Sequence, residues 1–170
     1  DHFNPVHVRH PEIYERGIVE FDPQAQAWQK RRTFPLNASA LPEGHALART
    51  LNGVGYLYYA NPCPLIRVRA DAECLQDPAA YEAFTCQPAG LKGEETQVDR
   101  DAGGLPRYAW RKGSPPLHPI TQGRLLKSGA LRPGESLTAF REPDTGQTFV
   151  PHRGSVNWNP FRRRWVMIAN

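Results

Sequence analysis

Long apolar runs are missing from this sequence of 170 residues. Because a membrane-spanning helix needs about 20 consecutive apolar residues, we expect no membrane span. No secretory signal peptide is visible either, and the chain begins at Asp1 and stops at Asn170 directly after a predicted strand. We therefore expect a segment of a longer protein. Its compartment is not determined by the sequence, although an exported protein is favoured.

Cysteine is scarce, with three residues at Cys63, Cys74 and Cys86. Their spacing fits neither a zinc site nor a Cys-x-x-Cys redox pair. In an exported protein Cys74 and Cys86 could form a disulfide and leave Cys63 free, whereas three free thiols are the alternative.

Clear metal-ligand patterns are also lacking. His2, His7 and His10 lie close together near the start, yet no Asp or Glu follows them at ligand spacing. We predict no metal site and no cofactor.

Positive charge is only in slight excess, with 21 Lys and Arg against 17 Asp and Glu. The two densest basic triplets, Lys30-Arg31-Arg32 and Arg162-Arg163-Arg164, each flank a predicted hairpin and form no continuous basic face. We therefore predict no nucleic-acid partner.

What the sequence does contain is turns and short strands. Its 17 prolines, 14 glycines and 39% hydrophobic residues are typical of a loop-rich globular protein with a single domain. We predict an all-β fold of antiparallel strands.

The end of the chain contains the most informative stretch. Residues 154–159 alternate small polar with apolar residues, a turn follows, and Trp165 begins an apolar run, which together predict a β-hairpin. The same pattern occurs over residues 44–61, where Tyr56 corresponds to Trp165 at an offset of 109 (165 − 56). Repeated hairpins indicate a propeller or another repeat architecture, with chance similarity as the alternative.

Each copy is preceded by two aromatic residues around an acidic turn. Phe21 and Trp28 flank the first turn, and Phe140 and Phe149 flank the second. This order extends the repeat upstream and predicts an outer hairpin before each copy.

Between the copies, residues 65–70 and 83–86 are predicted strands, which with the first hairpin make a four-stranded meander typical of one propeller blade. Asp77 is predicted to cap a short helical turn that begins at Pro78. Residues 108–111 are a further short strand, and residues 121–129 are ambiguous, with one helical turn as an option.

In a propeller, ligands bind at one mouth of the central channel, next to the innermost strand of each blade. The polar and aromatic residues at these strands favour hydroxyl-rich or anionic ligands, because amide and guanidinium groups hydrogen-bond to sugars while rings stack on their apolar faces. His45 and His152 are the candidates for proton transfer. The candidate substrate-binding residues are Arg49, Arg153, Ser155, Asn157, Trp158 and Asn159. Turn and core roles are the alternative for Asn157, Asn159 and Trp158.

Residues 53–61, followed by Ile66 to Asp71 and Leu75, resemble the blade pattern of the five-bladed β-propeller glycosidases, the clan of arabinanases, β-xylosidases, levansucrases and mannoside phosphorylases. Residues 154–168 are similar to the inner strands of another blade. The resemblance implies hydrolysis or related glycosyl transfer on an oligosaccharide or polysaccharide, and implies that the remaining propeller blades are partners of this segment.

One departure from that family bears on activity. Glycoside hydrolysis needs two carboxyl groups, one to donate a proton and one to compensate charge. At the matching inner-strand positions this chain has His45 and the pair His152-Arg153 instead. Whether the chain is an enzyme therefore stays open, and a non-catalytic glycan- or protein-binding module is the alternative.

We expect one propeller segment over residues 1–170. Within it, residues 1–43 are predicted to form the outer hairpin of a preceding blade and a loop, residues 44–139 one blade with an insertion, and residues 140–170 a hairpin and the first strands of the next blade.

Overall fold

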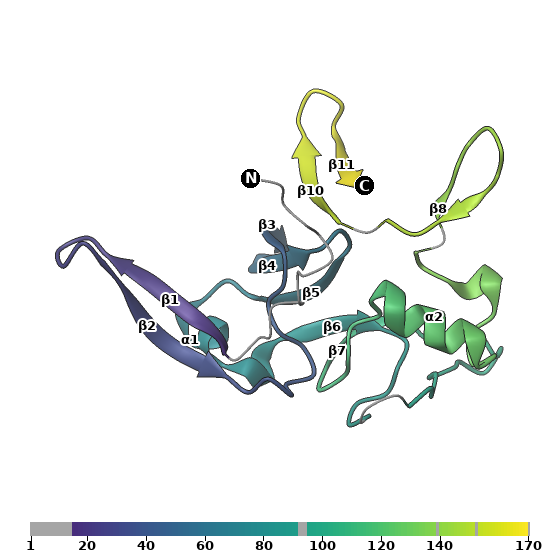
Figure 1. The fold of residues 1–170 in the computed structure, drawn as a ribbon, viewed down its shortest axis with the longest axis horizontal. Helices are drawn as coiled ribbons and strands as arrows, with labels where there is room; N and C mark the ends of the chain where they lie inside the picture. The colour runs from purple at the N-terminus through teal and green to yellow at the C-terminus, as the bar shows by residue number, and fades with distance from the viewer. Residues whose placement is uncertain (1–14, 92–94, 139, 152, 170) are drawn as a thin grey trace, which may run out of the picture. The chain divides into compact units, whose positions relative to one another are not determined.

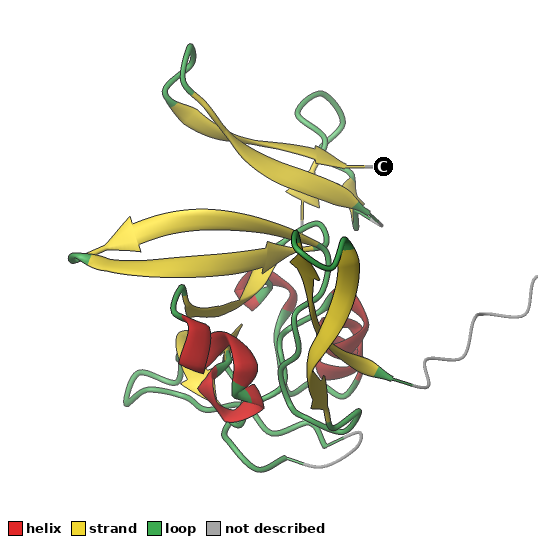
Figure 2. Cartoon of the chain, turned by 90° about the vertical axis from the view of Figure 1, so that its left-hand side faces the viewer, coloured by secondary structure: helices red, strands yellow, loops and turns green. Residues whose placement is uncertain are grey.

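The computed structural model describes residues 15–91, 95–138, 140–151 and 153–169 (Figure 1). Most of its regular structure is strand in antiparallel sheets, and its two α-helices are short (Figure 2). The predicted antiparallel β character is confirmed, with these helices as an addition. The chain divides into two compact units, Asp1–Asn37 and Ala38–Asn170.

The first unit contains one hairpin, formed by β1 (Arg16–Asp22) and β2 (Ala27–Phe34). Phe21 lies opposite Trp28, and their ring centroids are 5.4 Å apart in an edge-to-face arrangement. The Asp22 carboxylate accepts hydrogen bonds from the two backbone N–H groups that follow Pro23, at 2.9 and 3.0 Å, and so closes the turn. The aromatic pair and the acidic turn are both where the sequence predicts them.

The second unit is built on a five-stranded antiparallel sheet whose strands pair in chain order. Its strands are β3 (His45–Leu51), β4 (Val54–Ala60), β5 (Pro64–Arg69), β6 (Glu82–Thr85) and β7 (Ala109–Lys112). The predicted four-stranded meander is therefore one strand short. The segment around Trp110, which the sequence indicates as an isolated strand, pairs with β6 and completes the sheet.

The two faces of this sheet differ because side chains alternate along each strand. One face is the buried one, and it presents Ile66, Val68, Ala83 and Thr85, each at most 3% exposed. The opposite face carries aromatic and arginine side chains and is described with the candidate site.

Two short helical segments connect β5 to β6. They are α1 (Ala72–Gln76) and the 3-10 helix η2 (Pro78–Ala80). The Asp71 side chain accepts from the Cys74 N–H at 2.8 Å, and the Asp77 side chain accepts from the Ala79 N–H at 2.9 Å. The predicted cap at Asp77 is confirmed.

Beyond β7, the ambiguous segment 121–129 is part of the helix α2 (Pro119–Lys127), which the 3-10 helix η3 (Pro133–Glu135) follows. A buried cluster holds α2 in place. It consists of Cys86, Leu117, Leu125 and Leu131. Cys86 is thus part of the core, and all three cysteines are free thiols in the structure.

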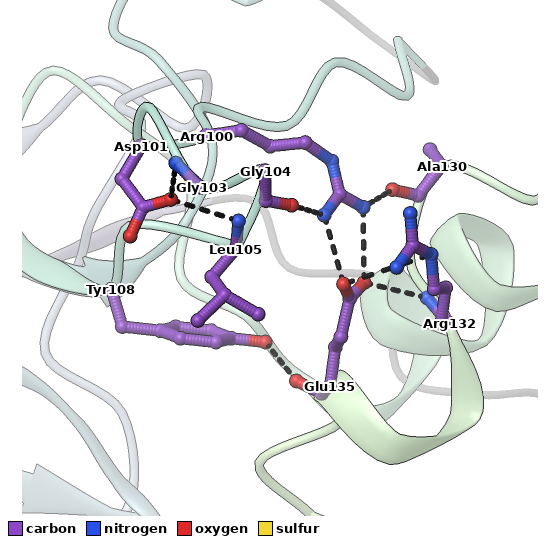
Figure 3. A network of polar contacts seen from close by, with 9 residues as sticks. All are labelled: Arg100, Asp101, Gly103, Gly104, Leu105, Tyr108, Ala130, Arg132 and Glu135. Atoms are coloured by element: carbon purple, nitrogen blue, oxygen red, sulfur yellow. Dashed lines mark hydrogen bonds and ion pairs between the residues drawn. The ribbon is translucent and has the colours of Figure 1, made fainter.

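A polar network ties the loop after β6 to η3 (Figure 3). The Arg100 guanidinium donates to both Glu135 carboxylate oxygens, at 2.9 and 3.0 Å, and to the carbonyls of Gly104 and Ala130, each at 2.6 Å. Tyr108 Oη donates to the Glu135 carbonyl at 2.7 Å. This network joins residues 100–108 to residues 130–135, two segments that have no strand pairing with each other.

Two further hairpins complete the described chain. They are β8 (Phe140–Arg141) with β9 (Thr148–Phe149), and β10 (Gly154–Asn159) with β11 (Arg164–Ala169). No helix in the described residues is long and apolar enough to cross a membrane.

Candidate functional site

The two hairpins that the sequence indicates as a repeat have the same strand register. His45 pairs with Ala60 in β3–β4, and Gly154 pairs with Ala169 in β10–β11. An offset of 109 residues (154 − 45 and 169 − 60) carries the first pair onto the second. Two aromatic segments that resembled each other by chance would not need to share a strand register. The shared register therefore supports a structural repeat.

These two hairpins also lie side by side. Strand β10 contacts both β3 and β4. The Arg49 guanidinium of β3 lies over the Trp165 ring of β11, 5.4 Å from its centroid. Packing one hairpin against the face of another leaves two depressions between them, and we call the pair the groove.

The first depression, of about 410 Å³, has the more polar lining of the two. Its lining comprises His45, Asn61, Arg153, Gly154, Ser155, Ile168 and Ala169. It therefore combines an imidazole, an amide, a guanidinium and a hydroxyl, which together can both donate and accept hydrogen bonds.

The second depression, of about 310 Å³, is mostly apolar. Its lining comprises Leu47, Arg49, Tyr58, Pro64, Val156 and Trp165. His45, Leu47 and Arg49 alternate along β3, so their side chains lie on one face of that strand. On the β10–β11 side the two linings come from opposite faces, with Ser155 and Ile168 in the first depression and Val156 and Trp165 in the second. We call the first depression the polar end of the groove and the second its aromatic end.

A half-buried cation lies among the aromatic rings next to this end of the groove. The Arg67 guanidinium lies between the rings of Tyr56 and Trp110, at 4.6 and 4.5 Å from their centroids, and pairs with Glu82 at 2.7 Å. Burial acts to lower the pKa of Arg67, but the hydrogen bonds with Glu82 and Tyr58 outweigh it and raise that pKa. Arg67 therefore stays charged and fixes the aromatic face on which the groove is built.

The structure brings together four of the sequence-predicted site residues. His45, Arg153 and Ser155 line the polar depression, and Arg49 lines the aromatic one. His45, Arg49 and Arg153 are exposed, and Ser155 is half-buried. His45 and Arg49 lie on β3, Ser155 lies on β10, and Arg153 directly precedes β10.

The other predicted residues lie elsewhere on the hairpin. Asn159 accepts a hydrogen bond from the Arg162 N–H at 2.8 Å within the turn, the role that the alternative interpretation gives it. Trp158 pairs edge-to-face with Trp165 at 5.6 Å, and Asn157 lies 3.5 Å from the Ser155 hydroxyl. His152 lies outside the described residues.

At the aromatic end of the groove, Arg49 is the only lining residue that the sequence predicts as a site residue. The sequence predicts Tyr58 and Trp165 as strand residues, without a role in the site. Tyr58 is two positions from Tyr56, so the alternation of β4 places both rings on the face that Trp165 covers. The pairing of Tyr56 with Trp165 in the repeat is the signal that indicates this aromatic surface.

Carboxylates do not contribute to the groove. Among the described residues that line its two depressions, none is acidic. In the same part of the chain, no three histidine, cysteine, aspartate or glutamate side chains gather as a metal site. The groove can hydrogen-bond and stack, and its described lining offers no carboxyl pair for glycoside hydrolysis.

Comparisons of the chain with protein-family models, with curated proteins and with solved structures gave no match.

Proposed function

We propose that this chain binds an oligosaccharide in the groove between β3–β4 and β10–β11, as part of a glycosidase-like β-propeller. The observation that carries the proposal is the groove itself, in which two hairpins of equal register place hydrogen-bonding side chains next to aromatic rings. Sugars need both, because their hydroxyls hydrogen-bond while their C–H faces stack on rings.

The packing of the hairpins supports the propeller part of the proposal. Blades of a propeller pack face to face around a central axis, with their innermost strands next to one another. Here β10 lies beside β3, and Trp165 covers the aromatic face of the β3–β7 sheet. Each of these two hairpins follows an outer hairpin in the sequence, which matches the order expected for consecutive blades.

Binding is favoured over hydrolysis by the composition of the groove. A retaining or inverting glycosidase needs two carboxyl groups roughly 5 to 10 Å apart. The described lining has none, so hydrolysis would require carboxylates from other blades of a longer protein. Glycosyl turnover, with His45 and His152 in proton transfer, is the second candidate, and the resemblance to the glycosidase clan favours it.

The first test is calorimetric titration of the chain with arabinan, xylan, mannan and fructan fragments. We expect one of them to bind, and we expect the Trp165→Ala and His45→Ala variants each to weaken binding by about tenfold, or about 1.4 kcal/mol. Trp28→Ala is the matched control, because Trp28 is 70% exposed on β2 and lies outside the groove.

Two outcomes contradict the proposal. One is the absence of binding to any fragment, and the other is an equal loss in the Trp28→Ala variant. Chromatography of the same mixtures separates the two candidate functions, since product that disappears in the His45→Ala and His152→Ala variants would indicate turnover.

A further inference from the structure

We infer that the groove selects a saccharide with an anionic substituent, a carboxylate or a sulfate, over a neutral one. The inference rests on the proposed function and adds the charge of the ligand to it. It comes from the distribution of charge around the groove and from the two arginines that face it.

The segments that form the groove contain no acidic residue. The chain has 17 Asp and Glu, and none of them falls within residues 44–70 or 145–170. These segments supply every residue that lines the two depressions. Their arginines are Arg49, Arg67, Arg69, Arg153, Arg162, Arg163 and Arg164. The groove is therefore lined by segments whose positive charge is not compensated by acidic residues of the same segments.

Carboxylates from outside these segments neutralise only some of the arginines. Glu82 pairs with Arg67 at 2.7 Å, and Asp71 pairs with Arg69 at 3.1 Å. Arg49 and Arg153, in contrast, have no carboxylate partner among the described residues. Both guanidinium groups that line the groove are therefore uncompensated, as are those of Arg162, Arg163 and Arg164 in the β10–β11 turn region.

The position of Arg49 suits an anion bound beside a sugar ring. Its guanidinium lies over the Trp165 ring at 5.4 Å, so one face is occupied and the N–H edge is left to donate. A guanidinium edge binds a carboxylate or a sulfate through two parallel hydrogen bonds. The same ligand can then stack its ring on the aromatic end of the groove.

Arg153 provides a second anion contact at the polar end. It lines the depression together with His45, Asn61 and Ser155, so donors for sugar hydroxyls lie around it. An oligosaccharide with repeated anionic units that occupied both depressions would contact both arginines. A uronic-acid oligomer and a sulfated oligomer share this chemistry.

The test uses three galactose-based oligomers of equal length: neutral, uronic-acid and sulfated. We expect the anionic oligomers to bind at least about tenfold more tightly than the neutral one. Their affinity should fall as salt rises from about 50 to about 200 mM, because partly exposed ion pairs are screened, while the neutral affinity stays constant. Comparing the uronic-acid and sulfated arms identifies which anion the groove prefers.

Variants locate the effect. We expect Arg49→Gln and Arg153→Gln each to reduce anionic binding several-fold to tenfold, and to reduce neutral binding by a clearly smaller factor, because only the anionic ligand loses an ion pair. Arg32→Gln removes the same charge from an exposed position of β2 and is the matched control. A loss in the control equal to that in the groove variants would mean that net charge alone is responsible, and would overturn the inference.

The remaining outcomes separate the two proposals. Equal binding of neutral and anionic oligomers would overturn the inference and leave the proposed function intact. Binding of none of the three, or of the neutral fragments tested above, would refute both. A single-stranded oligonucleotide that bound as tightly as the anionic oligomers at the same sites would show a general polyanion surface and would also overturn the inference.

Discussion

At the scale of single residues, the most constrained group in the described chain is the Glu135 carboxylate. Its side chain is 9% exposed and accepts from the Arg100 guanidinium and from the Arg132 N–H. The hydrogen bonds from these two residues, with Arg100 the larger cause, lower the pKa of Glu135 to about 2. The carboxylate is therefore charged in the folded protein at neutral and mildly acidic pH.

This shift links the stability of the protein to pH. In the unfolded chain a glutamate titrates near about 4.3, so as the pH falls the unfolded state binds the proton first. The contribution of Glu135 to stability is fully present above about pH 4.3 and is lost as the pH falls toward about 2. We expect Glu135→Gln to be less stable than the unmodified chain at pH 7 and to approach it as the pH falls through that window, by urea unfolding.

Glu20→Gln is the control for this prediction. Glu20 pairs with Arg31 at 2.6 Å, but the two side chains are 60% and 44% exposed, and exposed pairs contribute little. The stability difference should depend on pH much less in this variant. If both variants showed the same pH profile, the Arg100–Glu135 network would have no special part in acid unfolding.

At the scale of elements, the two repeated hairpins differ mainly in their turns. The β3–β4 turn is closed by Asn52 and Gly53, which both have positive φ, 51° and 78°. The β10–β11 turn is longer and is held by the hydrogen bond from Arg162 to Asn159. The tight turn depends on a glycine, since other residues rarely adopt this conformation.

Two glycine substitutions should act in opposite directions. We expect Gly53→Ala to destabilise the protein by about 1 kcal/mol, because alanine is strained at positive φ even though nothing crowds the position. Gly123 lies exposed within α2 and not at positive φ, so Gly123→Ala should stabilise by about 0.5 to 1 kcal/mol. Chemical denaturation of both variants checks this, and a loss of stability in both would show that packing outweighs backbone conformation at Gly123.

The elements predicted well from the sequence are those with local signals. The hairpins show alternation next to a turn, and the cap at Asp77 is followed by a proline at the first helical position. Each signal lies within about ten residues of what it specifies, so no knowledge of the rest of the chain is needed.

The elements that escaped prediction depend on contacts distant in sequence. The pairing of β6 with β7 joins Phe84 to Trp110, and α2 is held by Leu125 against Leu117 and Cys86. Helix α2 begins with proline and contains Gly123, so local propensity alone does not specify it. The repeat predicts the two hairpins that border the groove, but it gives no contact between Arg49 and Trp165, which are distant in the sequence.

At the scale of the whole molecule, apolar surface is concentrated on the small hairpins. Trp158, Phe161 and Ile168 of the β10–β11 region are 46%, 93% and 71% exposed. In the described part of the chain, β11 pairs only with β10, so its outer edge presents unpaired backbone groups. The equivalent strand β4 pairs on both sides, with β3 and with β5. An open edge next to exposed apolar side chains is a surface on which another strand can add.

We therefore expect the chain to associate in a concentration-dependent way, measured by size-exclusion chromatography with light scattering. A lysine on an edge strand opposes strand addition, because its charge would be buried against the incoming strand. Ile168→Lys should accordingly weaken association by about tenfold or more. Ile120→Lys is the matched control, since Ile120 is 80% exposed on α2, away from any strand edge. If both lysine variants reduced association equally, general solubility and not the β11 edge would be the cause. If the unmodified chain stayed monomeric at all concentrations, the β11 edge would already be protected.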